Sequence, residues 1–388
     1  MKELKNNIFY CGLNDENRPL FDELIPLEHG TTYNSYYIKG SEKTALIDTM
    51  YPPKIEEYIS NLQKDGVNKV DYIIANHGEQ DHTGALPALI KLYPEAKIVT
   101  NAICKNNIMS MLFIPEDKIR VVKTGEELSL GDKTLRFITA PGVHWPDTMF
   151  TYAVEDNVLF TCDFLGAHKI FENPIANCDE DLKSAAKRYY AEIMMPFRSF
   201  CQKYTKMIKE MNVDMIMPSH GPVYDNPDFI LDLYTDWASD ESKNMVVLPY
   251  VSMYGSTLEM VNYVGEKLKS AGIEVVKFDI VNGDLGEYAM TLVDAKTIII
   301  GSPMVLMGPH PNAMNAASLT AVLNPKAKYL SVIGSFGWGG KLVEKLTEPF
   351  ANSKIEMLDP VLVKGKAKEP DFTKLDELVN SITERHRG

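Results

Sequence analysis

The sequence predicts two domains of mixed α/β and α+β structure: an αββα sandwich of two sheets with helices outside, then a doubly wound parallel sheet. The chain has 388 residues, which at roughly 150 residues per domain favours two domains. Short apolar runs cluster in the first half before a long helical stretch, whereas strands and helices alternate in the second half. The change of pattern near residues 242–244 predicts domains at 1–245 and 246–388.

The first half contains more predicted strands than helices. Three apolar runs that precede polar loops, 44–48, 70–75 and 96–100, are expected to be strands, with a helix over 84–92. Four alternating runs follow at 119–122, 134–139, 149–153 and 158–161, before a helical stretch over about 181–211. Strands grouped in this way are typical of sheets packed face to face.

The second half alternates regularly. Strands are predicted at 245–251, 274–278, 297–301 and 329–333, and helices at 257–271, 312–323 and from about 340. This alternation is typical of a parallel sheet with right-handed crossovers.

Composition excludes several classes of protein. The formal net charge is -13, from 53 acidic and 40 basic residues, which disfavours nucleic acid as a partner. No apolar run approaches the roughly 20 residues of a membrane span, and residues 1–10 do not resemble a secretory signal, so we expect a cytoplasmic protein. The five cysteines include no C-x-x-C pair, which argues against a disulfide framework and against a cysteine metal site.

The densest chemical signal is His77-x-Glu79-x-Asp81-His82, directly after a predicted strand. A loop that leaves a strand can turn several side chains to one side, which a regular helix or strand with this spacing cannot do. Taken alone, the string is also compatible with a solvated polar loop.

Three further residues, His144, Asp163 and His220, likewise follow apolar runs. Each alone is compatible with a structural role. Together with the first cluster they make seven potential ligands, four imidazoles and three carboxylates, and so predict a metal site. Carboxylate oxygens combined with imidazoles suit iron or manganese.

The full pattern resembles the ligand set of the metallo-β-lactamase-like fold. Zinc hydrolases of that fold usually have His where this chain has Glu79. This departure, together with the second domain, resembles the flavodiiron proteins, and the resemblance covers essentially the whole chain. It implies that His77, Glu79 and His144 hold one iron, that Asp81, His82 and His220 hold the other, and that Asp163 bridges them.

Three segments of the second domain follow the carboxyl ends of predicted strands, where parallel sheets bind ligands. They are Ser252-Met253-Tyr254-Gly255-Ser256-Thr257, Ser302-Pro303-Met304 and Ser335-Phe336-Gly337-Trp338-Gly339. Hydroxyl and N–H groups at a helix start can bind a phosphate, and Trp338 can lie against a flat ring. The first segment alone is also compatible with a capped turn. The spacing resembles flavodoxin, which implies FMN as the cofactor.

Two weaker candidates are expected beside the metal pocket. His29 lies in a segment that resembles one whose His approaches the metals in the family, and Tyr190 is expected to face the pocket. Each is equally compatible with packing alone.

The resemblance implies reduction of O2 to water, or of NO to N2O, at a non-haem di-iron site supplied with electrons by FMN. It implies an external donor, rubredoxin or a reduced deazaflavin, and a head-to-tail homodimer or a dimer of dimers. Two alternatives stay open: a zinc-dependent hydrolase of the same fold, and an FMN electron carrier with an inactive metal domain. The first-domain ligands alone do not predict a preference between O2 and NO.

Overall fold

The computed structural model describes residues 1–21 and 23–387, and the chain divides into two compact units, Met1–Ala238 and Ser239–Gly388. The predicted domain boundary between residues 245 and 246 stays a prediction. Within the described residues, no helix combines the length and apolar character needed to cross a membrane.

Unit 1 contains two sheets. The first has the order β1-β2-β7-β8-β9-β10-β11, with parallel pairing from β8 onward, and the second has the order β12-β13-β14-β15-β16, antiparallel except for the last pair. The strands of the first sheet are β1 (Lys2–Lys5), β2 (Ile8–Tyr10), β7 (Tyr36–Lys39), β8 (Thr44–Ile47), β9 (Tyr72–Ile74), β10 (Lys97–Thr100) and β11 (Ile119–Val121). Those of the second are β12 (Glu127–Ser129), β13 (Thr134–Thr139), β14 (Met149–Ala153), β15 (Val158–Cys162) and β16 (Met215–Pro218). Two short hairpin-like pairs, β3 (Leu13–Asp15) with β6 (Thr31–Tyr33) and β4 (Leu20–Phe21) with β5 (Ile25–Pro26), complete the strands of this unit.

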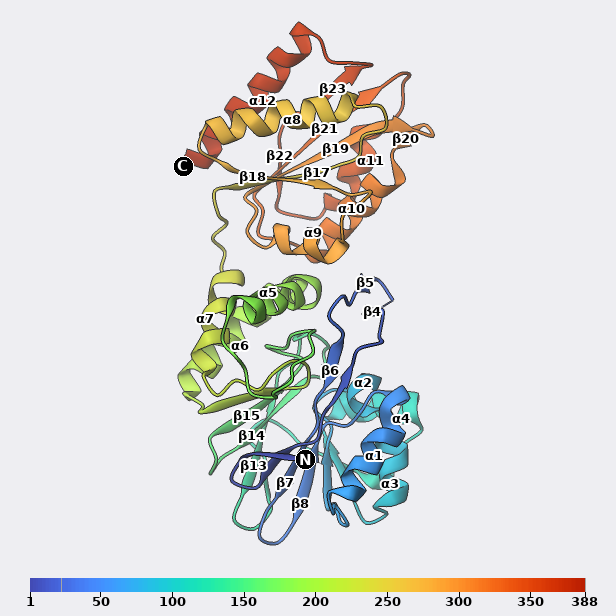
Figure 1. Cartoon of the computed structure of the whole chain (residues 1–388), viewed down its shortest axis with the longest axis vertical. Coiled ribbons are helices and arrows are strands. Elements are labelled where there is room, and N and C mark those ends of the chain that lie inside the picture. The colour runs from blue at the N-terminus through green and yellow to red at the C-terminus, as the bar shows by residue number, and fades with distance from the viewer. Residues whose placement is uncertain (22, 388) are drawn as a thin grey trace. The chain divides into compact units, whose positions relative to one another are not determined.

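Helices cover the outer face of each sheet, as Figure 1 shows: α1, α3 and α4 on one side and α5, α6 and α7 on the other. Their bounds are α1 (Ile55–Lys64), α2 (Gln80–Thr83), α3 (Leu86–Leu92), α4 (Ala102–Leu112), α5 (Glu180–Tyr189), α6 (Arg198–Met211) and α7 (Pro227–Trp237). This is the predicted αββα sandwich.

The alternation of side chains along the strands explains the layers. In β8, Leu46 packs with the helices while Ile47 packs between the two sheets, and Ile73 and Ile74 of β9 divide in the same way. Because successive strand residues point to opposite faces, a strand covered on both sides must be apolar throughout. Polar residues, among them predicted metal ligands, follow the ends of these buried strands.

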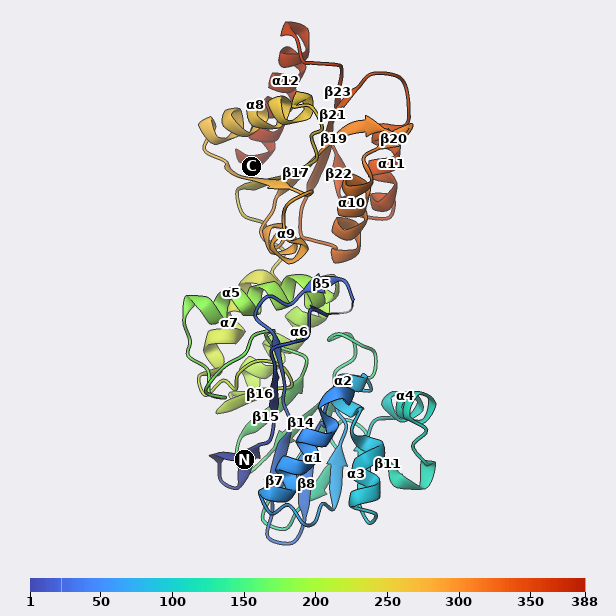
Figure 2. The same cartoon turned by 45° about the vertical axis from the view of Figure 1, so that its right-hand side comes forward.

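Unit 2 is a parallel sheet of order β18-β17-β19-β21, extended by β22 and β23. Its strands are β17 (Met245–Tyr250), β18 (Glu274–Asp279), β19 (Thr297–Val305), β20 (Gly308–Pro309), β21 (Tyr329–Phe336), β22 (Glu356–Met357) and β23 (Val361–Lys364). Its helices are α8 (Ser256–Ser270), α9 (Leu285–Leu292), α10 (Pro311–Leu323), α11 (Leu342–Thr347) and α12 (Glu369–Arg387). In Figure 2, α8 and α12 cover one face and α10 and α11 the other, as a doubly wound sheet requires.

The elements differ from expectation in two respects. The helical stretch expected over 181–211 is interrupted by a π-helical turn, Tyr190–Met194, and a 3-10 turn, Met195–Phe197, because Pro196 cannot donate a backbone hydrogen bond. The strands expected at 297–301 and 329–333 both run further. Pairing with β20 extends β19, and pairing with β23 extends β21, so the loops expected there are partly strand.

Candidate metal centre and ligand cavity

The seven predicted metal ligands lie at neighbouring strand ends of unit 1. His77 follows β9, Asp163 directly follows β15 and His220 follows β16, while Asp81 and His82 lie in the short helix α2. The carboxyl ends of these strands meet at one edge of the sandwich, so residues far apart in sequence come together. Their ligand atoms form two groups with no atoms more than 4.8 Å apart: His77, Glu79, His144 and Asp163 in one, Asp81, His82 and His220 in the other.

Asp163 contacts both groups through different oxygens. Its Oδ2 lies 3.6 Å from Nε2 of both His77 and His144, and its Oδ1 lies 2.8 Å from His82 Nε2 and 3.4 Å from His220 Nε2. Two donor atoms that each lie about 2.1 Å from one ion, at a tetrahedral angle, are about 3.4 Å apart. The spacing therefore suits two metal ions that share one carboxylate.

Several of these atoms are buried without a hydrogen bond. Asp81 Oδ1, His82 Nε2 and Asp163 Oδ2 have no hydrogen-bond partner among the described residues. His82 Nε2 is close to Asp163 Oδ1, but the angle does not make a hydrogen bond. Buried polar atoms without partners are costly unless something binds them. The donor set thus fits metal ions.

The electrostatics show how strongly the site favours positive charge. Burial lowers the pKa of His82, but the carboxylates of Asp163 and Asp81 outweigh it and raise the pKa to about 10. Burial raises the pKa of Asp163, but His82 and the other imidazoles hold it well below its usual range. Without metal, protonated His77 and His82 offset part of the carboxylate charge.

The second ring nitrogens of two histidines have fixed partners. His77 Nδ1 lies 2.7 Å from Asp147 Oδ1, and Asp147 also accepts hydrogen bonds from Gly78 N (3.0 Å) and Asn107 Nδ2 (2.7 Å). His220 Nδ1 donates to the carbonyl of Thr32 at 2.6 Å. Such partners leave Nε2 free to bind a metal. Sequence reasoning missed Asp147, although an acidic residue three positions after His144 was a usable signal.

Residues that follow β8 form hydrogen bonds with the segments that carry the predicted ligands. The buried Asp48 carboxylate accepts hydrogen bonds from Asn76 N (2.8 Å) and from Ser219 Oγ (2.9 Å), the residues just before His77 and His220. Thr49 donates through N (2.6 Å) and Oγ1 (2.7 Å) to the carbonyl of His82. Neither residue was singled out from the sequence.

Aromatic rings surround the predicted ligands. Trp145 lies edge-on to His77, with ring centres 4.8 Å apart, and His168 lies 4.9 Å from His220. Tyr189 contacts the rings of both His168 (4.8 Å) and His220 (6.2 Å).

The two weaker candidates lie elsewhere. The side chain of His29 is exposed and belongs to neither ligand group. Tyr190 is buried against Tyr234 and Trp237, and its hydroxyl donates to the carbonyl of Trp237 at 3.2 Å. Its neighbour Tyr189 is the tyrosine that contacts His220, because adjacent residues on a helix point in different directions.

Unit 2 contains a cavity of about 430 Å³ at the carboxyl ends of β17, β19 and β21. Eleven of the predicted cofactor residues line it: Ser252, Met253, Tyr254, Ser256, Thr257, Pro303, Met304, Ser335, Phe336, Gly337 and Trp338. Val305 and Gly365 line it too, and Gly365 belongs to a loop that sequence reasoning missed. Gly255, Ser302 and Gly339 are not part of the lining. Ser302 is fully buried, where its Oγ accepts from His310 N at 3.1 Å.

The cavity has one polar end and one aromatic rim. Ser256 begins the long helix α8, and the hydroxyls of Ser252, Ser256 and Thr257 lie at that helix start. Helix N-termini attract phosphate through their unpaired N–H groups. Tyr254 is 91% exposed and Trp338 59% exposed, so large aromatic faces are available to a bound ring. The lining therefore fits a phosphorylated, flat molecule.

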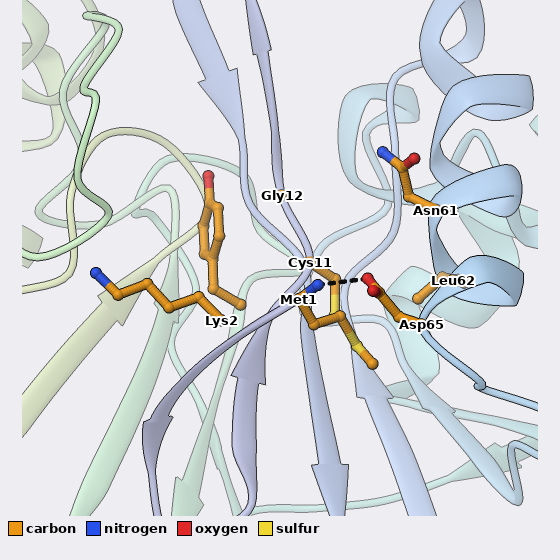
Figure 3. Close-up of a pocket in the computed structure, with 8 residues that line it drawn as sticks. Met1, Lys2, Cys11, Gly12, Asn61, Leu62 and Asp65 are labelled. Carbon is orange, nitrogen blue, oxygen red and sulfur yellow. Dashed lines mark hydrogen bonds and ion pairs between the residues drawn. The ribbon is translucent and has the colours of Figure 1, made fainter.

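Another cavity of unit 1, about 380 Å³, contains none of the predicted ligands (Figure 3). The amino group of Met1 pairs with Asp65 there, and Lys2 points away from that pair. Its lining consists of Met1, Lys2, Tyr10, Cys11, Gly12, Asn61, Leu62 and Asp65.

Fold and site together define a metallo-β-lactamase-like sandwich joined to a flavodoxin-like sheet, as predicted. Residues 31–221 match the family model described as "ODP family beta lactamase". The chain is 34% identical to the nitric oxide reductase of Moorella thermoacetica over 366 residues, 92% of this chain and 90% of that protein. It is 32% identical to flavo-diiron protein FprA2 of Clostridium acetobutylicum over 371 residues, 92% and 90% of the two chains.

A solved structure of rubredoxin oxygen:oxidoreductase from Desulfovibrio gigas superposes with a TM-score of 0.94 at 28% identity, covering 100% of this chain and 98% of that one. This chain belongs to the flavodiiron protein family, and it is an oxidoreductase.

Proposed function

We propose that the protein reduces O2 to water, NO to N2O, or both, at a non-haem di-iron site that receives electrons from FMN. The observation that carries the proposal is the division of the Asp163 oxygens between two groups of ligand atoms. A carboxylate placed in this way suits a pair of ions close enough to act on one small molecule. Relatives named nitric oxide reductase and rubredoxin oxygen:oxidoreductase support the choice of substrates.

In the proposed centre, His77, Glu79 and His144 would hold one iron, Asp81, His82 and His220 would hold the other, and Asp163 would serve both through its two oxygens. The ligand chemistry favours iron, because three carboxylates supply hard oxygen donors beside four imidazoles. The irons, when bound, supply electrons and open positions for the gas. Asp147 and the Thr32 carbonyl keep His77 and His220 in the tautomer that presents Nε2.

In the proposed flavin site, the helix start at Ser256 and its neighbouring hydroxyls bind the phosphate of FMN. Tyr254 and Trp338 lie against the ring. FMN, when bound, accepts electrons in pairs and releases them singly. The proposed donor is external, rubredoxin or a reduced deazaflavin, and the name of the Desulfovibrio relative supports rubredoxin.

The decisive test is anaerobic consumption of NO, and separately of O2, by protein of known iron and FMN content with a chemical reductant and rubredoxin. We expect consumption of at least one gas, lost in His82→Ala. The matched control is His386→Ala, which removes a histidine of unit 2 that contacts Thr297 and Asn244. If protein loaded with two irons and one FMN consumes neither gas, the proposal is wrong, and assays for zinc-dependent hydrolysis or simple electron transfer come next.

A further inference from the structure

Arg18 is held in place beside the metal centre by aromatic side chains. Its Nη1 donates to the hydroxyl of Tyr33 at 2.7 Å and its Nε to the carbonyl of Leu20 at 3.1 Å. The guanidinium carbon lies 4.7 Å from the ring centre of Tyr51 and 5.6 Å from that of Phe21. Four contacts therefore fix a half-buried cation.

Two paths of ring contacts lead from Arg18 to His220. Tyr33, which stacks on Tyr51 at 5.0 Å, meets the edge of the His220 ring at 5.7 Å. Phe21 lies 4.5 Å from the ring of His168, which lies 4.9 Å from that of His220. The guanidinium is thus one aromatic side chain away from a predicted ligand.

Among residues 1–21 and 23–387, no carboxylate forms an ion pair with the charged side chain of Arg18. Burial lowers the pKa of Arg18, but Tyr33 and then the charge of Asp81, a predicted ligand, outweigh burial and raise it. The charge of Arg18 therefore interacts with that of a predicted metal ligand.

We propose that Arg18 is a positioning residue that supplies a fixed positive charge to the metal centre, weakening the binding of divalent ions and favouring the binding of small anions to the loaded centre. The proposal rests on the proposed function in one respect: it takes Asp81 and His220 as metal ligands. In a half-buried site, a unit charge near a divalent ion, screened by salt, changes the affinity for that ion on the order of tenfold.

The first test is titration of metal-free protein with Mn²⁺ under anaerobic conditions. Arg18→Gln, which removes the charge and keeps a donor for Tyr33, is expected to bind Mn²⁺ on the order of tenfold more tightly. Arg18→Lys is expected to restore most of the wild-type affinity, because a positive charge remains at the site. Arg120→Gln, an exposed arginine of β11, is the matched control for net charge and is expected to resemble wild type.

The second test is binding of azide to the oxidised, iron-loaded protein, followed by its absorption spectrum. Arg18→Gln is expected to bind azide on the order of tenfold more weakly, again with rescue by lysine. If Arg18→Gln matches Arg120→Gln in both titrations, the proposal is wrong. If Arg18→Gln does not fold, Arg18→Met takes its place, since it removes the charge and keeps an apolar side chain against the rings of Phe21 and Tyr51. Unchanged affinities in Arg18→Met overturn the proposal.

The outcomes are distinguishable from failure of the proposed function. Neither titration requires turnover of O2 or NO, so a protein that consumes neither gas still reports the effect of Arg18. If the protein binds no metal at the predicted residues, the proposed function is wrong, whatever the effect of Arg18.

Discussion

Asp147 is the residue whose removal most directly tests how the metal centre is supported. It is fully buried, and hydrogen bonds from His77, Asn107 and Gly78 offset the effect of burial and hold its pKa below the usual value. Asp147→Asn places an amide N–H opposite the donors of Gly78 and Asn107. We expect metal affinity to fall about 10- to 100-fold, measured by Mn²⁺ titration.

The matched control is Asp132→Asn, an exposed aspartate of unit 1 that accepts from Ser41 N. Equal metal affinity in the two variants would contradict the role of Asp147.

The histidines make metal binding depend on pH. The pKa of His82 is raised to about 10 and that of His77 well above its usual value, so both rings carry a proton in metal-free protein at neutral pH. A metal ion must displace these protons. Affinity therefore rises with pH, about tenfold per unit for each proton displaced, between about pH 6 and pH 9. Mn²⁺ titrations in that range would measure it, and a dissociation constant that does not change with pH would show that the rings are already neutral.

At the scale of elements, the end of β8 aligns three ligand-bearing segments. Asp48→Asn leaves Asn76 N and Ser219 Oγ with a weaker hydrogen-bond acceptor. We expect the free energy of unfolding to fall by about 1–3 kcal/mol. Urea unfolding of metal-free protein measures this decrease, and the metal content of the purified variant should fall with it. Asp65→Asn, at the surface end of α1, is the control. If the variant loses stability but keeps its full metal content, Asp48 stabilises the fold and does not position the ligands.

The turn before α8 imposes a second constraint. Gly255 has φ +87°, a left-handed conformation that a β-branched residue adopts only with strain. We expect Gly255→Val to cost about 1–2 kcal/mol and to weaken FMN binding. Gly337→Val also faces open space but has no positive φ, so unfolding of its flavin-free form should match wild type. Equal loss of stability in both variants would argue against backbone strain.

Sequence patterns predicted the fold class because buried strands, alternation and turn residues are local signals. The predicted ligands could be named because they follow apolar runs, His77 to His82 as one string and His144, Asp163 and His220 singly. Residues that act through distant contacts could not: Asp147 reaches His77 across 70 positions, and Gly365 joins its cavity only through pairing of β23 with β21. Tyr190 is predicted to face the pocket, yet Tyr189 contacts His220, because two adjacent tyrosines do not show how a helix is rotated about its axis.

At the scale of the whole molecule, the proposed head-to-tail dimer predicts complementation between chains. His82→Ala should lack a complete metal centre, and Gly255→Val should bind FMN weakly, so each alone should have little activity when FMN is limiting. If electrons pass from the flavin of one subunit to the metals of its partner, mixed dimers should recover gas consumption. Light scattering gives the oligomeric state. Dimers that exchange subunits yet recover no activity would contradict transfer between subunits.

The positions of the tryptophans have a practical consequence. The chain has three: Trp145 touches His77, Trp338 lines the cavity of unit 2, and Trp237 is buried against Tyr190 and Tyr234. Each indole therefore emits from a different environment. Paramagnetic iron should quench the fluorescence of Trp145, and energy transfer to an isoalloxazine should quench that of Trp338. Variants that keep only Trp145 or only Trp338 would let one spectrometer follow the filling of each site separately, and the variant that keeps only Trp237 is the reference.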